Sequence, residues 1–357
     1  MTFERHIKSS VRRLEAYAVK GRPLSPDLIK LNQNENPFDV PEPLKRELTE
    51  ELLRMPWNRY PDVFPAALTA ALAERLGIPP DWVIAANGSN ELMYTVMMAV
   101  VGRGTKVLIP SPTFFLYEKI VAVMEGEVVD VPARADLSFD TEGIIAAART
   151  HRPALIVLNS PNSPTGQMLP PGDVERILRE TDALVLADEA YIEFADQPSV
   201  LPLLRSSDRL IVLRTFSKAL SLAGLRIGYL AAQGPLCAEL MKPKIPFTVN
   251  AFSAAAALAL MRRPELVDER IVLIKREKQR LFEALGRLPG VRVFPSQTNF
   301  LIFIPPGGAK GVFERLLAAD VLVRDVGSYP MLGNALRVNA GTPEENDAFL
   351  DALKRIL

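Results

Sequence analysis

The sequence predicts an α/β protein with a mostly parallel sheet, followed by a smaller α+β domain. Between residues 65 and 232, helical periodicity alternates with short apolar runs of strand length. This alternation is typical of parallel sheets covered by helices. After residue 250 it gives way to longer amphipathic stretches, and a chain of 357 residues exceeds the usual size of one domain.

Helical and strand-like runs follow one another through the α/β part. The first helix, at 66–76, ends at Gly77 before two prolines. The other helices are expected at 92–101, 114–124, 142–149 and 172–180. The strands are expected at 107–109, 128–129, 155–158, 184–186, 210–213 and 227–230. Ligands of such sheets bind beyond the carboxyl ends of the strands, so polar clusters that follow strands are candidate site residues.

The C-terminal third has a different pattern. A small-residue helix is expected at 251–261 and a long amphipathic helix at 265–288. Further strands are expected at 291–294, 300–303, 321–323 and 336–338, with helices at 312–317 and from 343 onward. The first 50 residues carry no clear periodic run. We therefore expect a large domain over 51–249 and a small domain made of 1–50 and 250–357.

Composition narrows the classes of function. Lys plus Arg equals Asp plus Glu at 42 each, so no net charge draws the chain to nucleic acid or to an anionic membrane. The single cysteine, Cys237, excludes an internal disulfide, and two histidines are too few for a zinc cluster, so no metal is expected. The start of the sequence lacks a signal-peptide pattern, and no apolar run approaches the ~20 residues of a membrane span. A cytoplasmic protein is expected.

Lys218 lies in a small, apolar stretch directly after the strand-like run 210–213. A desolvated ammonium group loses its proton more readily, and a second cation, Arg226, would act in the same direction. A neutral amine is what Schiff-base formation requires. A Ser-Lys pair in a loop is more often structural, so this interpretation depends on the motifs upstream.

Three upstream motifs have both a chemical and a structural interpretation. Gly88, Ser89 and Asn90 precede a helix, where they form either a phosphate cradle or an ordinary N-cap. Asn162 lies in a loop that two prolines make rigid, which favours a functional amide over a plain turn. Asp188 ends a buried strand, where a carboxylate needs a cation or an ion pair.

The order of these motifs describes a pyridoxal 5'-phosphate site. Asp188 would hold a pyridine nitrogen protonated, and Lys218 would join the cofactor aldehyde. Asn162 and Tyr191 can hydrogen-bond the ring oxygen, because both carry suitable donors. The phosphate would be held by Ser89, Ser217 and Arg226.

The chain resembles the fold-type-I aminotransferases, and within them the histidinol-phosphate aminotransferases. Besides the motifs above, the resemblance is carried by residues 13–17, 31–37, 59–62, 323–325 and 336–346. It implies a large domain with a mostly parallel seven-stranded sheet flanked by helices, a smaller α+β domain, and a homodimer with shared active sites.

The resemblance also implies roles for single residues. Phe114 matches the aromatic residue that stacks on the cofactor ring, although most relatives have tyrosine there. Tyr60 matches a tyrosine that reaches the cofactor phosphate of the neighbouring subunit. Arg337 matches the arginine that takes the anionic group of the amino donor. The substrate phosphate would be held by Tyr17 and Arg324, with Asn34 in the same pocket.

The expected reaction is amino transfer from L-histidinol phosphate to 2-oxoglutarate, giving imidazole acetol phosphate and L-glutamate in histidine biosynthesis. Lys218 would carry the proton between substrate and cofactor. An aromatic amino acid aminotransferase or a threonine-phosphate decarboxylase would keep the same cofactor residues. A ligand-sensing module would need neither Lys218 nor both distal arginines, Arg324 and Arg337.

Overall fold

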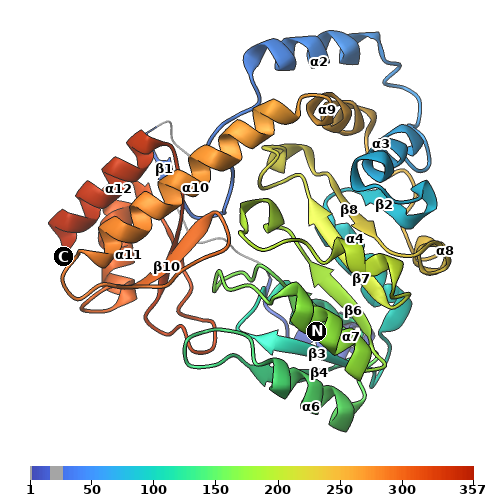
Figure 1. Ribbon diagram of the computed structural model, residues 1–357, viewed down its shortest axis with the longest axis horizontal. Helices are drawn as coiled ribbons and strands as arrows, with labels where there is room; N and C mark the ends of the chain where they lie inside the picture. Colours follow the sequence, from blue (N-terminus) through green and yellow to red (C-terminus); the bar gives the residue numbers. More distant parts are fainter. Residues whose placement is uncertain (1, 17–26) are drawn as a thin grey trace.

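The computed structural model describes residues 2–16 and 27–357 and shows a large sheet beside a smaller one (Figure 1). In this part of the chain the large sheet has seven strands, in the order β2-β8-β7-β6-β5-β3-β4. Neighbouring strands run parallel, except that β8 is antiparallel to both β2 and β7. The predicted mostly parallel seven-stranded sheet is confirmed. The strands are β2 (Val83–Ala86), β3 (Lys106–Ser111), β4 (Glu127–Pro132), β5 (Leu155–Asn159), β6 (Leu184–Asp188), β7 (Leu210–Thr215) and β8 (Gly228–Ala231).

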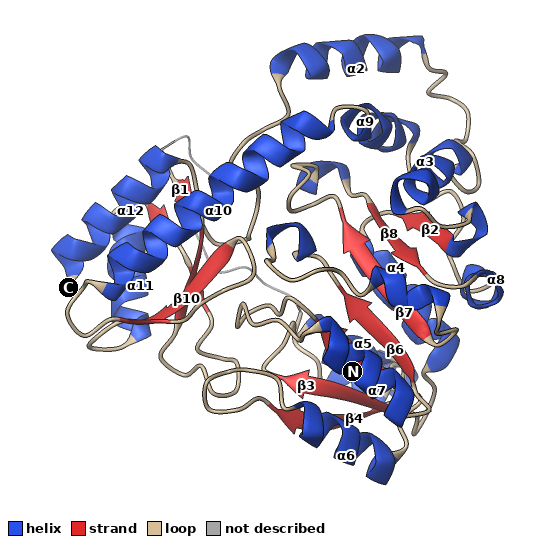
Figure 2. Cartoon of the chain, in the orientation of Figure 1, coloured by secondary structure: helices blue, strands red, loops and turns tan. Residues whose placement is uncertain are grey.

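Helices cover both faces of this sheet (Figure 2). In β5, Leu155 and Val157 pack into one core, and Ile156 and Leu158 pack into the other, as the pleat of a strand dictates. The first core is completed by α4 (Ser89–Val100), α5 (Leu116–Val123) and α8 (Gly234–Met241). The second is completed by α6 (Thr141–His151) and α7 (Pro171–Glu180). Burial on both faces explains the continuous apolar runs of the central strands.

The smaller part contains an antiparallel sheet in the order β12-β13-β10-β9, formed by β9 (Arg292–Val293), β10 (Phe300–Ile304), β12 (Arg324–Asp325) and β13 (Leu336–Asn339). The helices α10 (Pro264–Gly286), α11 (Ala309–Ala318) and α12 (Pro343–Ile356) pack against it. Near the start of the chain, β1 (Ile29–Lys30) pairs in parallel with β11 (Val321–Leu322). The expected strand 321–323 corresponds to β11, which ends at Leu322, and β12 follows directly in the other sheet.

A further hydrophobic cluster lies at the β2 edge of the large sheet. It contains α2 (Glu42–Arg54), α3 (Ala66–Leu76) and α9 (Ala251–Met261), and α10 runs from it to the smaller sheet (Figure 1). The predicted domain boundary at residue 50 falls inside α2, and the one at residue 249 falls just before α9; both boundaries stay a prediction. The remaining helical elements are α1 (Ser9–Arg12) and the 3-10 helices Thr2–His6, Pro80–Trp82, Ile192–Phe194, Leu201–Arg205 and Ala223–Leu225.

The structure contains elements that the sequence did not indicate. Strand β2 has only four residues before the turn at Asn87, too few to show a period. Helix α2 buries only Leu44 and Leu48, so its apolar face is narrow. Among the described residues, every helix is too short or too polar to cross a bilayer. The same residues include no group of three or more His, Cys, Asp or Glu that could hold a metal ion.

Candidate active site

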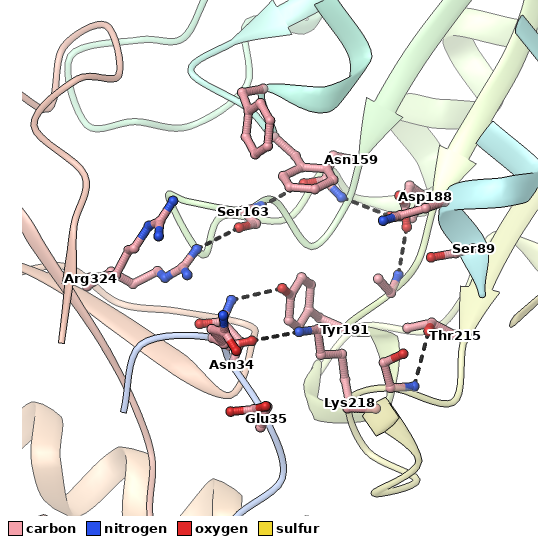
Figure 3. Close-up of a pocket in the computed structure, with 18 of the residues that line it drawn as sticks. Asn34, Glu35, Ser89, Asn159, Ser163, Asp188, Tyr191, Thr215, Lys218 and Arg324 are labelled. Carbon is pink, nitrogen blue, oxygen red and sulfur yellow. Dashed lines mark hydrogen bonds between the residues drawn. The ribbon is translucent and has the colours of Figure 1, made fainter. Parts of the chain in front are cut away.

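A cavity of about 400 Å³ lies at the carboxyl ends of the large-sheet strands (Figure 3). Asp188 and Lys218 reach it from the large sheet, Asn34 from the N-terminal segment, and Arg324 and Arg337 from the smaller sheet. Arg324 lies on the opposite side of the cavity from Asp188 and Ser89 (Figure 3). The fold therefore brings together residues that are more than 300 positions apart in sequence.

Lys218 follows β7 and turns its amine toward the N-terminal segment. Its Nζ donates a hydrogen bond to the backbone carbonyl of Gln33 at 2.8 Å. Burial lowers the pKa of Lys218, and the positive charges of Arg337 and Arg226 lower it further, while Tyr191 and Glu35 oppose the shift. A buried lysine with this environment supplies a neutral amine more readily than a solvated one.

Asp188 is the last residue of β6 and is fully enclosed. The Tyr117 hydroxyl donates to its Oδ2 at 2.7 Å, and the backbone N–H of Ala190 donates to its Oδ1 at 3.0 Å. Burial raises the pKa of Asp188 to about 6 despite these hydrogen bonds. Burial and the neighbouring carboxylate also raise the pKa of Tyr117 well above its usual value, so Tyr117 stays a neutral donor. The Asp188 carboxylate is suited to a ligand that brings a proton or a positive charge.

The N-terminus of α4 and Arg226 form an anion cradle. Ser89 and Asn90 line the cavity from the first turn of α4. Arg226 Nη1 donates to the Ser217 hydroxyl at 3.1 Å and to the Ala223 carbonyl at 3.0 Å. Gly88, at φ 81°, permits this packing, because a Cβ there would lie 2.5 Å from Arg226 Nη2. Helix N–H groups, a hydroxyl and a guanidinium are the donors that a phosphate requires.

Asn162 lies outside the cavity lining. Its Nδ2 donates to the Pro112 carbonyl and to the Thr165 hydroxyl, both at 2.8 Å, and its Oδ1 accepts from the Thr113 hydroxyl at 2.8 Å. Both amide hydrogens are therefore used within the protein. Two other residues of the same loop, Asn159 and Ser163, line the cavity instead.

Tyr191 and Asn34 contact each other across the cavity wall (Figure 3). Asn34 Nδ2 donates to the Tyr191 hydroxyl at 2.8 Å. The backbone of Asn34 has a φ of 55° and is fixed by side-chain hydrogen bonds with Asn339 and Asn299. Tyr191 also packs edge-on against Phe300, with ring centroids 5.3 Å apart. These contacts attach the N-terminal segment to the loop after β6 and to the smaller sheet, and they shape the cavity.

Arg324 and Arg337 are direct cross-strand partners in β12 and β13. Side chains at such positions lie on the same face of a sheet, and here both line the cavity. Arg337 is 9% exposed; its Nη1 donates to the Ser163 hydroxyl and its Nη2 to the Asn32 carbonyl, both at 3.0 Å. Two guanidinium groups on one wall make that wall a second anion site.

The remaining predicted residues lie in three different places. Phe114 lines the cavity and packs edge-on against Tyr117, with centroids 5.8 Å apart. Tyr60 lies outside the cavity, 83% exposed, with its ring 4.9 Å from that of Phe247. Tyr17 lies outside the described residues.

The model of the family "Aminotransferase class I and II" matches residues 26–353. The chain belongs to this family. It is 48% identical over 352 residues to the histidinol-phosphate aminotransferase of Chlorobaculum parvum, covering 99% of this chain and 98% of that protein.

Two solved structures extend the comparison. The structure of histidinol-phosphate aminotransferase from Sinorhizobium meliloti in complex with pyridoxal-5'-phosphate has a TM-score of 0.87 and 25% identity, covering 98% of this chain and 97% of that one. L-threonine-O-3-phosphate decarboxylase from Porphyromonas gingivalis has a TM-score of 0.81 and 26% identity, covering 91% and 98%. The fold-type-I assignment is thus confirmed.

The cavity of this aminotransferase fits pyridoxal 5'-phosphate. It has a half-buried lysine, Lys218, for the aldehyde and a buried carboxylate, Asp188, for the ring nitrogen. At the other end of the cavity, Gly88 has no side chain, so the Arg226 guanidinium can lie next to the N-terminus of α4. The phosphate donors converge at this point. Membership of the aminotransferase family implies pyridoxal 5'-phosphate, and these residues match the chemistry of that cofactor.

The sequence pattern did not single out several residues that hold the site. Tyr117 and Asn159 contact Asp188, Ser163 contacts Arg337, and Gln33 contacts Lys218. Tyr117 follows Phe114 by three positions, so the two side chains lie on the same side of the turn that opens α5. This spacing could have indicated that Tyr117 belongs to the site. The contact of Gln33 is made by its backbone and leaves no signal in the side-chain pattern.

Proposed function

We propose that this aminotransferase moves the amino group of L-histidinol phosphate to 2-oxoglutarate, forming imidazole acetol phosphate and L-glutamate in histidine biosynthesis. The name shared by its curated relatives supports this substrate. The observation that carries the proposal is the pair Arg324 and Arg337, which face the same cavity as Lys218. A donor that carries a phosphate suits a wall with two guanidinium groups.

Pyridoxal 5'-phosphate is the cofactor that these residues would hold. When bound, it supplies an aldehyde that joins amines and a ring that accepts the electron pair left by a departing proton. Asp188 would meet the ring nitrogen, Phe114 would cover one face of the ring, and Tyr191 would reach the ring oxygen. The phosphate would be held by Gly88, Ser89, Asn90, Ser217 and Arg226. Asn162 would act indirectly, by fixing the loop that carries Asn159 and Ser163.

Lys218 is the residue that moves the proton. Its Nζ accepts a proton from the substrate carbon that bears the amine and delivers a proton during the exchange. The lowered pKa of Lys218 raises the fraction of neutral amine, the form that this step needs. Gln33 holds the amine through its carbonyl and so fixes the direction of the Lys218 side chain.

Asp188 and Tyr117 stabilise charge at the far end of the cavity. The Asp188 carboxylate, inside a dry site, favours a proton or positive charge on any group placed against it. Tyr117 and Ala190 fix the carboxylate oxygens from behind, so little reorganisation is needed during the reaction.

Arg337 and Arg324 position the substrates. Arg337 would take the phosphate of the donor in one half of the cycle and a carboxylate of 2-oxoglutarate or glutamate in the other, since a guanidinium fork binds both. Arg324 would take the donor phosphate together with Tyr17, and Asn34 would line the same pocket. Asn34 donates one amide hydrogen to Tyr191, and its Oδ1 has no hydrogen-bond partner among the described residues, so this oxygen could accept from the substrate.

The active enzyme is proposed to be a cytoplasmic homodimer with shared active sites. Tyr60 is almost fully exposed and does not line the cavity of its own chain. Exposed apolar side chains lie close to it in the sequence, including Trp57, Val63 and Phe64, and its ring packs against the exposed Phe247. Exposed apolar side chains at such a place favour a protein partner, and Tyr60 would then reach the cofactor phosphate of the other subunit.

A single-turnover half-reaction tests the function. The cofactor-loaded protein is mixed separately with L-histidinol phosphate, phenylalanine, tyrosine and threonine phosphate, and the absorbance change from the aldehyde to the amine form of the cofactor is followed. Histidinol phosphate should convert the cofactor fastest, and Lys218→Ala should abolish the conversion.

Two outcomes would overturn the proposal. Conversion by the aromatic amino acids alone would make the protein an aromatic aminotransferase. Release of carbon dioxide from threonine phosphate would make it a decarboxylase, the activity named for the similar Porphyromonas gingivalis protein.

A further inference from the structure

A buried ion pair lies directly behind the anion cradle. Lys244 Nζ is 3.2 Å from Glu91 Oε1, and the two side chains are only 1% and 12% exposed. Glu91 belongs to the first turn of α4, the helix whose N-terminus carries Ser89 and Asn90. Neither Glu91 nor Lys244 lines the cavity, so the reaction proposed above does not use them.

Glu91 fixes the turn that forms the cradle. Its Oε2 accepts a hydrogen bond from the backbone N–H of Asn87 at 2.8 Å, and its Oε1 accepts from the Thr248 hydroxyl at 2.9 Å. A carboxylate at this end of a helix is favourable by itself, because the helix dipole places positive charge there. The same charge, however, repels a second anion bound at the same helix end.

Lys244 supplies the compensating charge. Its ammonium donates hydrogen bonds to the Thr248 hydroxyl at 3.0 Å and to the Ile245 carbonyl at 3.1 Å, in addition to the ion pair with Glu91 Oε1. Its ammonium also lies 5.6 Å from the centre of the Phe64 ring. Lys244 is thus held in one place, next to Glu91 and away from water.

We propose that Lys244 is a positioning residue for the cofactor phosphate. By neutralising Glu91, it lets one helix N-terminus keep the carboxylate that shapes the cradle and still accept a phosphate dianion. The inference rests on the proposed cofactor site but not on the identity of the amino donor.

The experiment measures binding of pyridoxal 5'-phosphate and of pyridoxal, which lacks the phosphate, to the cofactor-free protein. The variants are Lys244→Met, Glu91→Gln and the double variant. Lys244→Met should weaken pyridoxal 5'-phosphate binding about tenfold, because it leaves the Glu91 carboxylate unpaired near the phosphate. Pyridoxal binding should stay unchanged, and kcat at saturating cofactor should change much less than the affinity.

Glu91→Gln keeps an acceptor for Asn87 but removes the negative charge. It should therefore bind pyridoxal 5'-phosphate at least as tightly as the unaltered protein, and in the double variant it should restore most of the affinity that Lys244→Met loses. The control is Lys242→Met, since Lys242 pairs with Glu239 at 2.6 Å on the surface, with both side chains about two-thirds exposed. It should leave both affinities unchanged.

Several results would overturn the inference. The first is a loss of pyridoxal 5'-phosphate affinity below threefold in Lys244→Met. The second is an equal loss of pyridoxal affinity in that variant. The third is a double variant that binds pyridoxal 5'-phosphate as weakly as Lys244→Met. If Lys244→Met does not fold, Glu91→Gln decides alone, because weaker phosphate-cofactor binding in that variant contradicts charge compensation. Failure of the unaltered protein to bind pyridoxal 5'-phosphate through Lys218 would instead refute the proposed function.

Discussion

The Tyr117 hydroxyl donates a 2.7 Å hydrogen bond to Oδ2 of Asp188 in the buried core beside the large sheet. The same tyrosine packs edge-on against Phe114, with an interplanar angle of 88°. One side chain thus fixes both the carboxylate expected at the ring nitrogen and the aromatic ring expected on the ring face. We therefore expect Tyr117 to position the whole cofactor ring.

Tyr117→Phe should weaken cofactor binding about tenfold, because a buried hydrogen bond to a carboxylate is lost while the ring packing remains. The pKa of Asp188 should rise further, since Tyr117 holds it down in the folded protein. Cofactor affinity, measured as a function of pH, should fall at acid pH. In the variant this fall should begin at a higher pH than in the unaltered protein. The matched control is Tyr94→Phe, a half-buried tyrosine in α4 outside the cavity, which should behave like the unaltered protein.

Asp188→Asn should stabilise the cofactor-free protein at pH 8. Burial raises the folded-state pKa of Asp188 from 3.8 to about 6. The stability contributed by the protonated carboxyl is therefore present below about pH 4 and is lost as the pH rises through 6. Removing the charge should recover up to about 3 kcal/mol at alkaline pH.

Thermal unfolding of the cofactor-free protein and the variant at pH 5 and pH 8 measures this effect. The gain should be larger at pH 8, and Asp351→Asn, at the exposed surface of α12, should show no such dependence. A variant less stable than the unaltered protein at pH 8 would contradict the prediction. The same variant should bind the cofactor poorly, because the charge that the ring nitrogen needs is gone.

Two inactive variants, one altered at Lys218 and the other at Tyr60, should restore activity when their subunits are mixed. If Tyr60 serves the neighbouring site, mixing Lys218→Ala with Tyr60→Ala yields hybrid dimers that contain one complete site. Random mixing of equal amounts would restore about a quarter of the unaltered activity. Each variant alone should remain far below that level, and activity that never exceeds the sum of the separate variants would exclude a shared site.

Substitution of Arg324 and substitution of Arg337 should affect the two half-reactions differently. Arg324→Ala should slow the half-reaction with histidinol phosphate by about ten- to a hundredfold, since a charged hydrogen bond to the phosphate is lost. It should leave the half-reaction with glutamate nearly unchanged. Arg337→Ala should slow both, because the proposed role of Arg337 is to take an anionic group in each.

Single-turnover rates for both amino donors measure this separation. Arg292→Ala is the control, because Arg292 lies in the same sheet and stacks on Phe294, 4.6 Å from the ring centre. An equal effect of Arg324→Ala on both half-reactions would contradict the assigned role.

The sequence was most informative at the ends of strands. The buried runs of β6 and β7 are continuous and apolar, so a carboxylate and an ammonium directly after them had to lie at one edge of the sheet. Asp188 and Lys218 could therefore be placed in one site before any contact was known. Ser89 and Arg226 could be assigned to the phosphate end of the site, since a helix N-terminus and a guanidinium both bind phosphate.

Loops were predicted less well. Asn162 and Ser163 are adjacent, yet only Ser163 faces the cavity, because Asn162 is turned toward Thr113 and Pro112. Those partners lie about 50 positions away and belong to the loop after a different strand. A sequence pattern does not encode which side of a loop such distant contacts turn inward.

The sequence by itself determined the α/β class, the mostly parallel sheet and the chemical groups of the cofactor site, because periodic burial and the chemistry of strand ends are local properties. Tertiary structure alone decided that Tyr117 fixes Asp188, that Gln33 holds Lys218 and that Lys244 neutralises Glu91. Each of these pairs joins segments at least 70 positions apart. Such a contact depends on how whole elements pack, and neither residue type nor spacing specifies it.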